Sequence, residues 1–90
     1  MTVNEVIKNY GNFVSDIEIY KHRFPNDNKF HTDNLIYMDN NDVDKNTEVL
    51  NYEVMDEDDY NSDILANTYI YLDFDDIYDD KNATVLCILI

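Results

Sequence analysis

The sequence is poor in several residue types on which common functional motifs depend. Cysteine, glycine and proline each occur once, and tryptophan is absent. A single cysteine forms no internal disulfide and no cysteine-based metal site. Cys87 lies in an apolar run, which favours a buried structural thiol over a nucleophile. A single glycine excludes the usual glycine-rich loop that cradles phosphate.

Basic residues and long apolar runs are also scarce. Six Lys and Arg stand against 20 Asp and Glu, which gives a formal net charge of -14. The small basic patch of Lys21, Arg23 and Lys29 is opposed by this net repulsion from phosphate, so no direct nucleic-acid binding is expected. The patch could instead pair with acids of the same chain. The longest apolar run, residues 85–90, is far too short to cross a membrane.

Signals for export and catalysis are weak. The first ten residues are polar and amphipathic, which argues against a signal peptide, so we expect a cytoplasmic protein without a membrane partner. His22 and His31 have no partner at metal-binding spacing, and no Ser/His/Asp or Cys/His arrangement has local support. Carboxylates are so numerous that pairs of them carry no specific acid–base signal. The sequence thus predicts no enzyme activity, no catalytic residue and no cofactor.

What the sequence does contain is an acidic, apolar-rich single domain. Its 90 residues predict one domain over residues 1–90, and 44% apolar residues suffice for one small core. Residues 1–45 hold eight acids and five bases, whereas residues 46–90 hold twelve acids and one base. Such self-repulsion destabilises a compact fold. The excess of acidic residues therefore either keeps the protein soluble or, as we favour, complements a basic partner.

Periodicity predicts an α+β fold in which one N-terminal amphipathic helix packs on an antiparallel sheet of four to five strands. Thr2 and Glu5 have the spacing of a capping box at the start of a helix over residues 3–13. Alternation predicts strands, and one short helical turn is expected between two of them. The strands cover residues 16–24, 34–38, 48–55, 67–75 and 83–90, and the turn covers 63–66. The last strand is apolar nearly throughout, as a central strand covered on both faces would be, and we expect it to form a hairpin with residues 67–75.

Two acidic clusters are the candidate partner-binding site. Asp73 and Asp75, two residues apart on a predicted strand, are about 6.5 Å apart, much like consecutive phosphates of a nucleic acid. Neighbouring tyrosines would add flat surface that can stack on arginine. The predicted contact residues are Asp56, Glu57, Asp58, Asp59, Tyr60, Tyr69, Tyr71, Asp73, Asp75, Asp76, Asp79 and Asp80. The alternative is that these residues form a solvated acidic face with no partner.

One metal-binding pattern is also present. Asp42, Asp44, Asn46 and Glu53 occupy positions one, three, five and twelve of an EF-hand-like loop. Thr47 replaces the glycine that such a loop needs, and residues 48–55 alternate as a strand does. A calcium-binding module is therefore a minor alternative, and no metal is expected.

The chain resembles small acidic phage-encoded anti-defence proteins, in particular anti-CRISPR proteins of the DNA-mimic type. The resemblance lies in size, acidity and Asp/Glu-rich loops, and the stretches MTVNEVI, SDIEIY and LNYEV are similar to small phage proteins of low-GC Gram-positive bacteria. It implies an inhibitor, acting in the host bacterial cytosol, that occludes the DNA-binding or PAM-reading site of a Cas effector or another nuclease. The alternative is an assembly protein of a phage or mobile element that binds, as a homodimer for example, through an exposed edge of its sheet.

Overall fold

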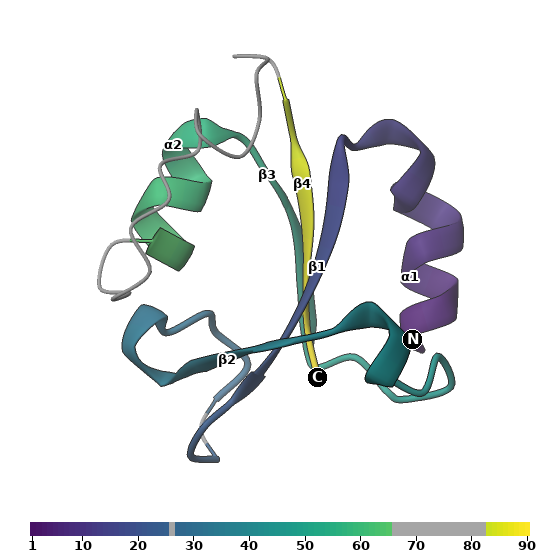
Figure 1. Cartoon of the computed structure of the whole chain (residues 1–90), viewed down its shortest axis with the longest axis horizontal. Helices are drawn as coiled ribbons and strands as arrows, with labels where there is room; N and C mark the ends of the chain where they lie inside the picture. Colours follow the sequence, from purple (N-terminus) through teal and green to yellow (C-terminus); the bar gives the residue numbers. More distant parts are fainter. Residues whose placement is uncertain (26, 66–82) are drawn as a thin grey trace.

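The structure is a computed structural model that describes residues 1–25, 27–65 and 83–90. Its regular elements follow in chain order (Figure 1): α1 (Val3–Tyr10), η1 (Gly11–Phe13), β1 (Asp16–His22), η2 (Thr32–Asn34), β2 (Leu35–Met38), η3 (Asn40–Asp42), β3 (Asn51–Met55), α2 (Glu57–Tyr60), η4 (Asn61–Leu65) and β4 (Val85–Leu89). The α+β class, with a helix near the N-terminus on a sheet of four strands, is confirmed. None of the described helices is long and apolar enough to cross a membrane.

The sheet is mixed, with the strand order β2-β1-β4-β3. β1 pairs antiparallel with β2, and β3 pairs antiparallel with β4, but β1 and β4 are parallel. The expected antiparallel arrangement is therefore wrong at this one pair. Alternation along a strand tells which side chains share a face, and it carries no information on which distant strand lies alongside. β4 has neighbours on both edges, which leaves no free edge for the predicted hairpin.

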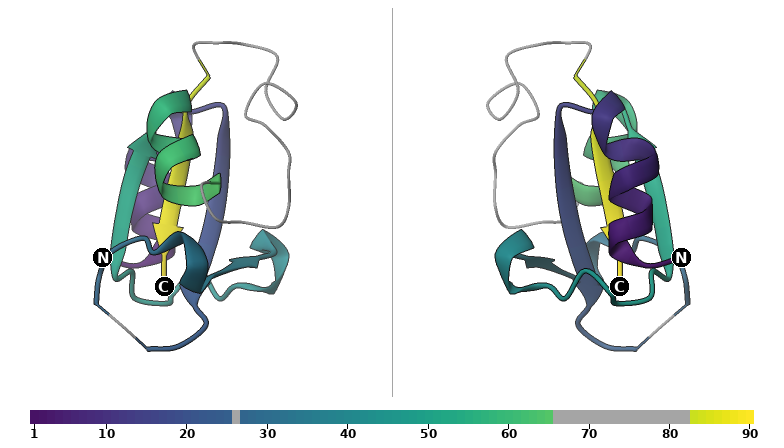
Figure 2. Two further views of the ribbon diagram at one scale, coloured as in Figure 1. Left: turned by 90° about the vertical axis from the view of Figure 1, so that its left-hand side faces the viewer. Right: turned by 90° about the vertical axis from the view of Figure 1, so that its right-hand side faces the viewer.

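Both faces of the sheet are covered, as Figures 1 and 2 show, with α1 on one face and α2 on the other. On the α1 side, Leu86 and Ile88 of β4 join a core cluster with Val3 and Val6. On the α2 side, a second cluster contains the alternate residues of β4 together with Tyr60 and Ile64. All five residues of β4 are buried, so the predicted central strand is confirmed. An apolar run of this kind suits a strand with two covered faces.

The N-terminal helix begins as its sequence predicts. The Thr2 side chain accepts from the backbone N–H of Glu5, and the Glu5 carboxylate accepts from the backbone N–H of Thr2, which completes the capping box. α1 ends at Tyr10 and continues as η1, so the predicted span of residues 3–13 is helical throughout. Gly11 follows because a Cβ there would lie 3.2 Å from Ile17 and 3.3 Å from Ile7, tighter than ordinary contact.

The remaining strands match their predicted places with shorter lengths. β3 begins only at Asn51, because Glu48 forms an isolated bridge to Thr2 and the N–H of Leu50 bonds to the carbonyl of Leu89. β2 lies within its predicted range. The strand predicted over residues 67–75 lies outside the described residues.

Candidate functional site

The acidic run, defined as Asp56, Glu57, Asp58 and Asp59, forms the start of α2 directly after β3. Asp56 is the N-cap: its backbone is extended and its carboxylate accepts from the N–H of Asp59 at 2.9 Å. Aspartate is among the best N-cap residues, and carboxylates in a first helical turn complement the free N–H groups there. This helix was not among the elements predicted from periodicity. The Asp-x-x-Asp spacing after a strand was the available signal.

A buried carboxylate fastens α2 to the sheet. Glu18 of β1 is 7% exposed, and each of its oxygens accepts from a tyrosine. The Tyr20 hydroxyl donates to one oxygen at 2.7 Å, and the Tyr60 hydroxyl donates to the other at 2.9 Å. Burial and the neighbouring Glu18 charge raise the pKa of both Tyr20 and Tyr60, so both hydroxyls keep their protons. Because Tyr60 ends α2, this bond fixes the position of the acidic run against β1.

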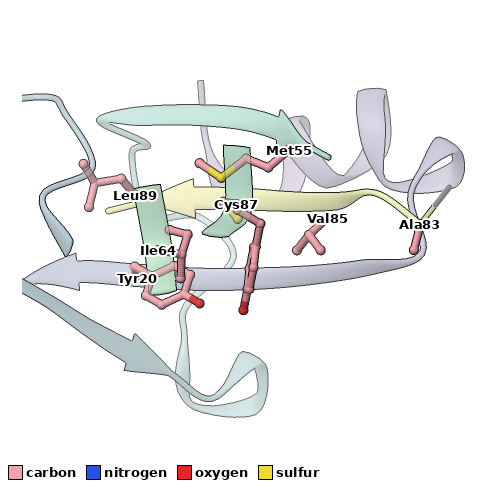
Figure 3. Packing of buried hydrophobic residues seen from close by; sticks show 8 residues of the cluster. Tyr20, Met55, Ile64, Ala83, Val85, Cys87 and Leu89 are labelled. Carbon is pink, nitrogen blue, oxygen red and sulfur yellow. The ribbon is translucent and has the colours of Figure 1, made fainter. Parts of the chain in front are cut away.

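The role predicted for Tyr60 is therefore wrong. Its side chain is 2% exposed and belongs to the core cluster of the α2 side, so it offers no surface to a partner. Figure 3 shows Tyr20, Ile64 and Cys87, which come from three different elements, meeting on this face. A tyrosine next to an acidic run was predicted to be a partner contact because the sequence alone does not reveal that its hydroxyl donates to the buried Glu18 carboxylate. The adjacent Asp56, Asp58 and Asp59 are exposed, as a partner-binding role requires.

The acidic run is crowded with like charge. The pKa of Asp59 is raised, first by the charge of Asp56, then by desolvation and by the charges of Asp63 and Asp58. In the described part of the chain the only ion pairs are Met1 with Glu48 and His31 with Asp27, and neither involves α2. Among the described residues, no cation forms an ion pair with the acids of α2, so nothing in that part of the chain offsets their negative charge.

Further acids line the α2 side of the sheet itself. Glu18, Cys87 and Glu53 stand opposite one another on β1, β4 and β3 in the strand register. Burial, together with the Glu18 and Glu53 charges, raises the pKa of the Cys87 thiol, which is free and buried. The prediction of a structural thiol is thereby confirmed. The pKa of Glu53 is raised, first by desolvation and then by the charges of Asp63 and Asp59.

A hollow of about 240 Å³ opens beside Glu53. The described residues that line it come from three segments: Lys29, Phe30, Asn51, Glu53 and Asp63. Asn51 and Glu53 are two residues apart on β3, so both side chains lie on the α2 side of the sheet. Neither Glu53 nor Asp63 was among the predicted contact residues, because each is an isolated acid in the sequence and their proximity comes from folding alone.

Of the predicted contact residues, only those of the acidic run and Tyr60 lie within the described residues. Asp63 adds its charge to that of the acidic run, since it raises the pKa of both Asp59 and Glu53. The other predicted contact residues lie outside the described residues: Tyr69, Tyr71, Asp73, Asp75, Asp76, Asp79 and Asp80.

The EF-hand-like pattern does not form a calcium loop. Asp42 ends η3, whereas Glu53 lies within β3, so the segment is not framed by two helices as an EF-hand is. Lys45 Nζ donates to the carbonyls of Asn40 and Val43, so the lysine ammonium group already bonds to two carbonyl oxygens near this loop. Within residues 1–25, 27–65 and 83–90, no group of three or more His, Cys, Asp or Glu side chains is placed to hold a metal ion.

The basic patch and the two histidines lie at the end of β1 and in the loop that follows it. His22 Nε2 lies 2.8 Å from the carbonyl of Lys29, and His31 Nε2 lies 2.7 Å from Asp27 Oδ1. The two rings are 5.8 Å apart. Lys21, Arg23 and Lys29 form no ion pair with an acid of the described chain, so the suggested internal pairing is not seen there.

Comparisons of this chain with protein-family models, with curated proteins and with solved structures each gave no match.

Proposed function

We propose that this protein is an inhibitor that presents carboxylates as a mimic of DNA. It would act in the host bacterial cytosol and occupy the basic nucleic-acid-binding site of a defence protein, a CRISPR–Cas nuclease or surveillance complex first of all. One observation carries the proposal. Four consecutive acids form the N-cap and first turn of α2, three of them are exposed, and a buried Glu18–Tyr60 hydrogen bond holds that helix to the sheet.

The physical argument concerns both charge and rigidity. A site that binds duplex DNA is lined with Lys and Arg, because the duplex is a dense line of fixed negative charge. A protein surface of net negative charge is steered to such a site and complements it. Carboxylates held on an anchored helix lose less conformational entropy on binding than carboxylates on a loose tail. The net charge of -14 adds long-range attraction.

The proposal is tested by capture with matched charge variants. Wild type, Asp58→Asn/Asp59→Asn and Asp42→Asn/Asp44→Asn are immobilised, and nuclease-treated bacterial lysate is passed over each. Both pairs of aspartates are exposed, so each variant removes two surface charges. The control pair lies beside the start of α1, where the carbonyl of Lys45 accepts from the N–H of Asn4. Bound protein is eluted by a salt gradient and, separately, by duplex DNA.

We expect a nucleic-acid-binding protein to be retained by wild type and by the control, weakened on Asp58→Asn/Asp59→Asn, and released by both salt and duplex DNA. If the two double variants retain it equally, or if duplex DNA does not release it, the acidic run serves solubility and the proposal is wrong.

A second candidate function is assembly of a phage or mobile element through a sheet edge. β3 has β4 on one side and no other described strand on its second edge. Leu50 and Val54, which flank and belong to β3, are 48% and 43% exposed. An open edge of this kind can pair with a second chain. Sedimentation at low and high salt separates the two functions, because pairing through an apolar edge persists at high salt whereas a charge-driven complex dissociates.

A further inference from the structure

The hollow beside β3 combines three kinds of chemistry in one place. Glu53 and Asp63 provide carboxylates, Asn51 provides an amide, and Phe30 provides an aromatic ring, all around a space of about 240 Å³. Lys29 lines the same space. These residues come from β3, from η4 and from the loop before η2, so the hollow exists only in the folded protein.

Among the described residues, neither carboxylate of this hollow forms an ion pair with a cation. Glu53 is half-buried, and desolvation and the Asp63 charge together disfavour its ionised form. In the part of the chain that the structure describes, Lys29 forms no ion pair with either acid, although it lines the same hollow. A ligand that brings positive charge between Glu53 and Asp63 would relieve this repulsion.

The groups that line the hollow favour a guanidinium group over an ammonium group. A guanidinium group is planar, offers donors in a fixed fork that matches carboxylate oxygens, and stacks on an aromatic ring. An ammonium group is a compact point charge that is strongly hydrated and gains less from a flat ring surface. Two carboxylates, an amide oxygen and the Phe30 ring are the partners that a guanidinium group can use together.

We propose that this hollow binds the guanidinium group of an arginine side chain. The source of the arginine rests on the proposed function, in which a basic protein docks beside α2. Asp63 would belong both to the hollow and to the charge field of the acidic run, because its charge acts on Glu53 and on Asp59. The hollow would then supply a specific anchor next to a surface that otherwise attracts by charge alone.

The test uses the whole protein and small capped amino acids, so it needs no knowledge of the partner. ¹⁵N-labelled protein is titrated with N-acetyl-arginine methylamide and, separately, with N-acetyl-lysine methylamide. We expect the arginine compound to shift the signals of Phe30, Asn51, Glu53 and Asp63 saturably, with a Kd of about 1–10 mM, as befits a single side chain. The lysine compound is expected to bind at least about threefold more weakly. Absence of saturable shifts up to about 100 mM arginine compound, or equal affinity for the two compounds, overturns the inference.

Single substitutions sharpen the result. Glu53→Gln keeps the shape of the side chain and removes its charge, so it should weaken arginine binding by about threefold or more. Lys29→Met removes a like charge from the rim and should strengthen binding. Asp42→Asn removes one exposed charge elsewhere and should leave the Kd within about twofold. If Glu53→Gln and Asp42→Asn behave alike, the shifts report general charge and the hollow is not a guanidinium site.

Failure of this inference is distinguishable from failure of the proposed function. The titration involves no partner protein, and the capture experiment with Asp58 and Asp59 variants involves no residue that lines the hollow. A protein that releases its captured partner to duplex DNA but ignores the arginine compound keeps the proposed function and loses the arginine site. A protein that binds the arginine compound but captures no nucleic-acid-binding protein keeps the site and loses the proposed source of its arginine.

Discussion

The two faces of the sheet are built from alternate residues of the same strands, and they differ sharply in chemistry. On the α1 side, Ile19 and Leu86 pack against Val3 and Val6, all fully buried and apolar. On the α2 side, the neighbouring residues of the same strands include Glu18, Cys87 and Glu53. One face is thus a plain hydrophobic core, whereas the other also holds carboxylates close to the acidic run.

The difference suggests a division of labour within one small domain. Burying a charged group is costly unless it is hydrogen-bonded, and Glu18 meets that condition with two tyrosine hydroxyls. The α1 side provides the apolar burial that offsets such costs. Substitutions on the α1 side should therefore change stability alone, whereas substitutions on the α2 side should change both stability and partner binding.

The largest expected effect is on the α1 side. Leu86→Ala should destabilise the fold by about 2–5 kcal/mol, since it removes a fully buried side chain from the central strand and leaves a cavity. Urea unfolding followed by circular dichroism measures this change. Val54→Ala, at a 43% exposed position of β3, is the control and should cost less than about 1 kcal/mol. Equal losses for the two variants would contradict the burial of Leu86 in the core of the α1 side.

The next effect concerns the anchor of α2. Tyr60→Phe keeps the buried ring, removes the hydrogen bond to Glu18 and should cost about 1 kcal/mol. Glu18→Leu removes the acceptor of both tyrosines, and each buried hydroxyl that loses its acceptor costs about 1–3 kcal/mol. In both variants, hydrogen exchange should accelerate in α2 and η4 more than in α1. Uniform acceleration over the whole chain would argue against an anchor that acts on α2.

A smaller effect is expected at the cap of α1. Thr2→Ala removes the side-chain acceptor for the N–H of Glu5 and should cost about 1 kcal/mol, whereas Thr2→Ser keeps the acceptor and should be nearly neutral. Thermal unfolding of the three proteins measures the difference. Partner binding should stay unchanged in both, because the cap lies on the α1 side. Weakened binding in Thr2→Ala, with the fold intact, would break the proposed division.

The smallest effect depends on pH. Desolvation, then Asp63 and Asp59, raise the pKa of Glu53 above its ordinary 4.5, so the folded state holds this proton more tightly than the unfolded state does. The resulting stabilisation is present below pH 4.5 and is lost as the pH rises through the raised pKa. Glu53→Gln cannot ionise, so its Tm should match that of wild type at low pH and exceed it by about 1–4 °C at pH 7.

Asp42→Asn is the control for this pH dependence, because it also removes one negative charge but from an exposed site on η3. It should show a smaller gain between low and neutral pH than Glu53→Gln does. If the two variants gain equally, the pH dependence reflects net charge and not the burial of Glu53.

Local structure was largely predictable because it depends on neighbouring residues. The capping box of Thr2 and Glu5 and the alternation of β1 are local patterns, and both appear as expected. The apolar run of β4 indicated two covered faces for the same reason. The sequence also contained a local signal for the start of α2, because Asp56 is a favourable N-cap residue. The signal was overlooked because a run of acidic residues is typical of a loop.

Long-range arrangement was not predictable from these patterns. The parallel pairing of β1 with β4 joins segments from opposite ends of the chain, and no periodicity encodes that choice. Glu18 alternates with Ile17 and Ile19, a pattern typical of a polar face, but α2 covers that face and the Tyr60 hydroxyl donates to the carboxylate. The hollow is a further case, since Phe30, Asn51 and Asp63 meet only in the fold.

The central claim, that the acidic run competes with DNA for a basic site, is tested most directly by displacement of DNA from the captured nuclease. Fluorescence anisotropy follows a labelled duplex bound to that protein while wild type, Asp58→Asn/Asp59→Asn or Asp42→Asn/Asp44→Asn is added. We expect wild type and the control to displace the duplex equally, and Asp58→Asn/Asp59→Asn to require about tenfold more protein, a loss of about 1.4 kcal/mol. Unchanged anisotropy with wild type, or equal displacement by all three proteins, would contradict the claim.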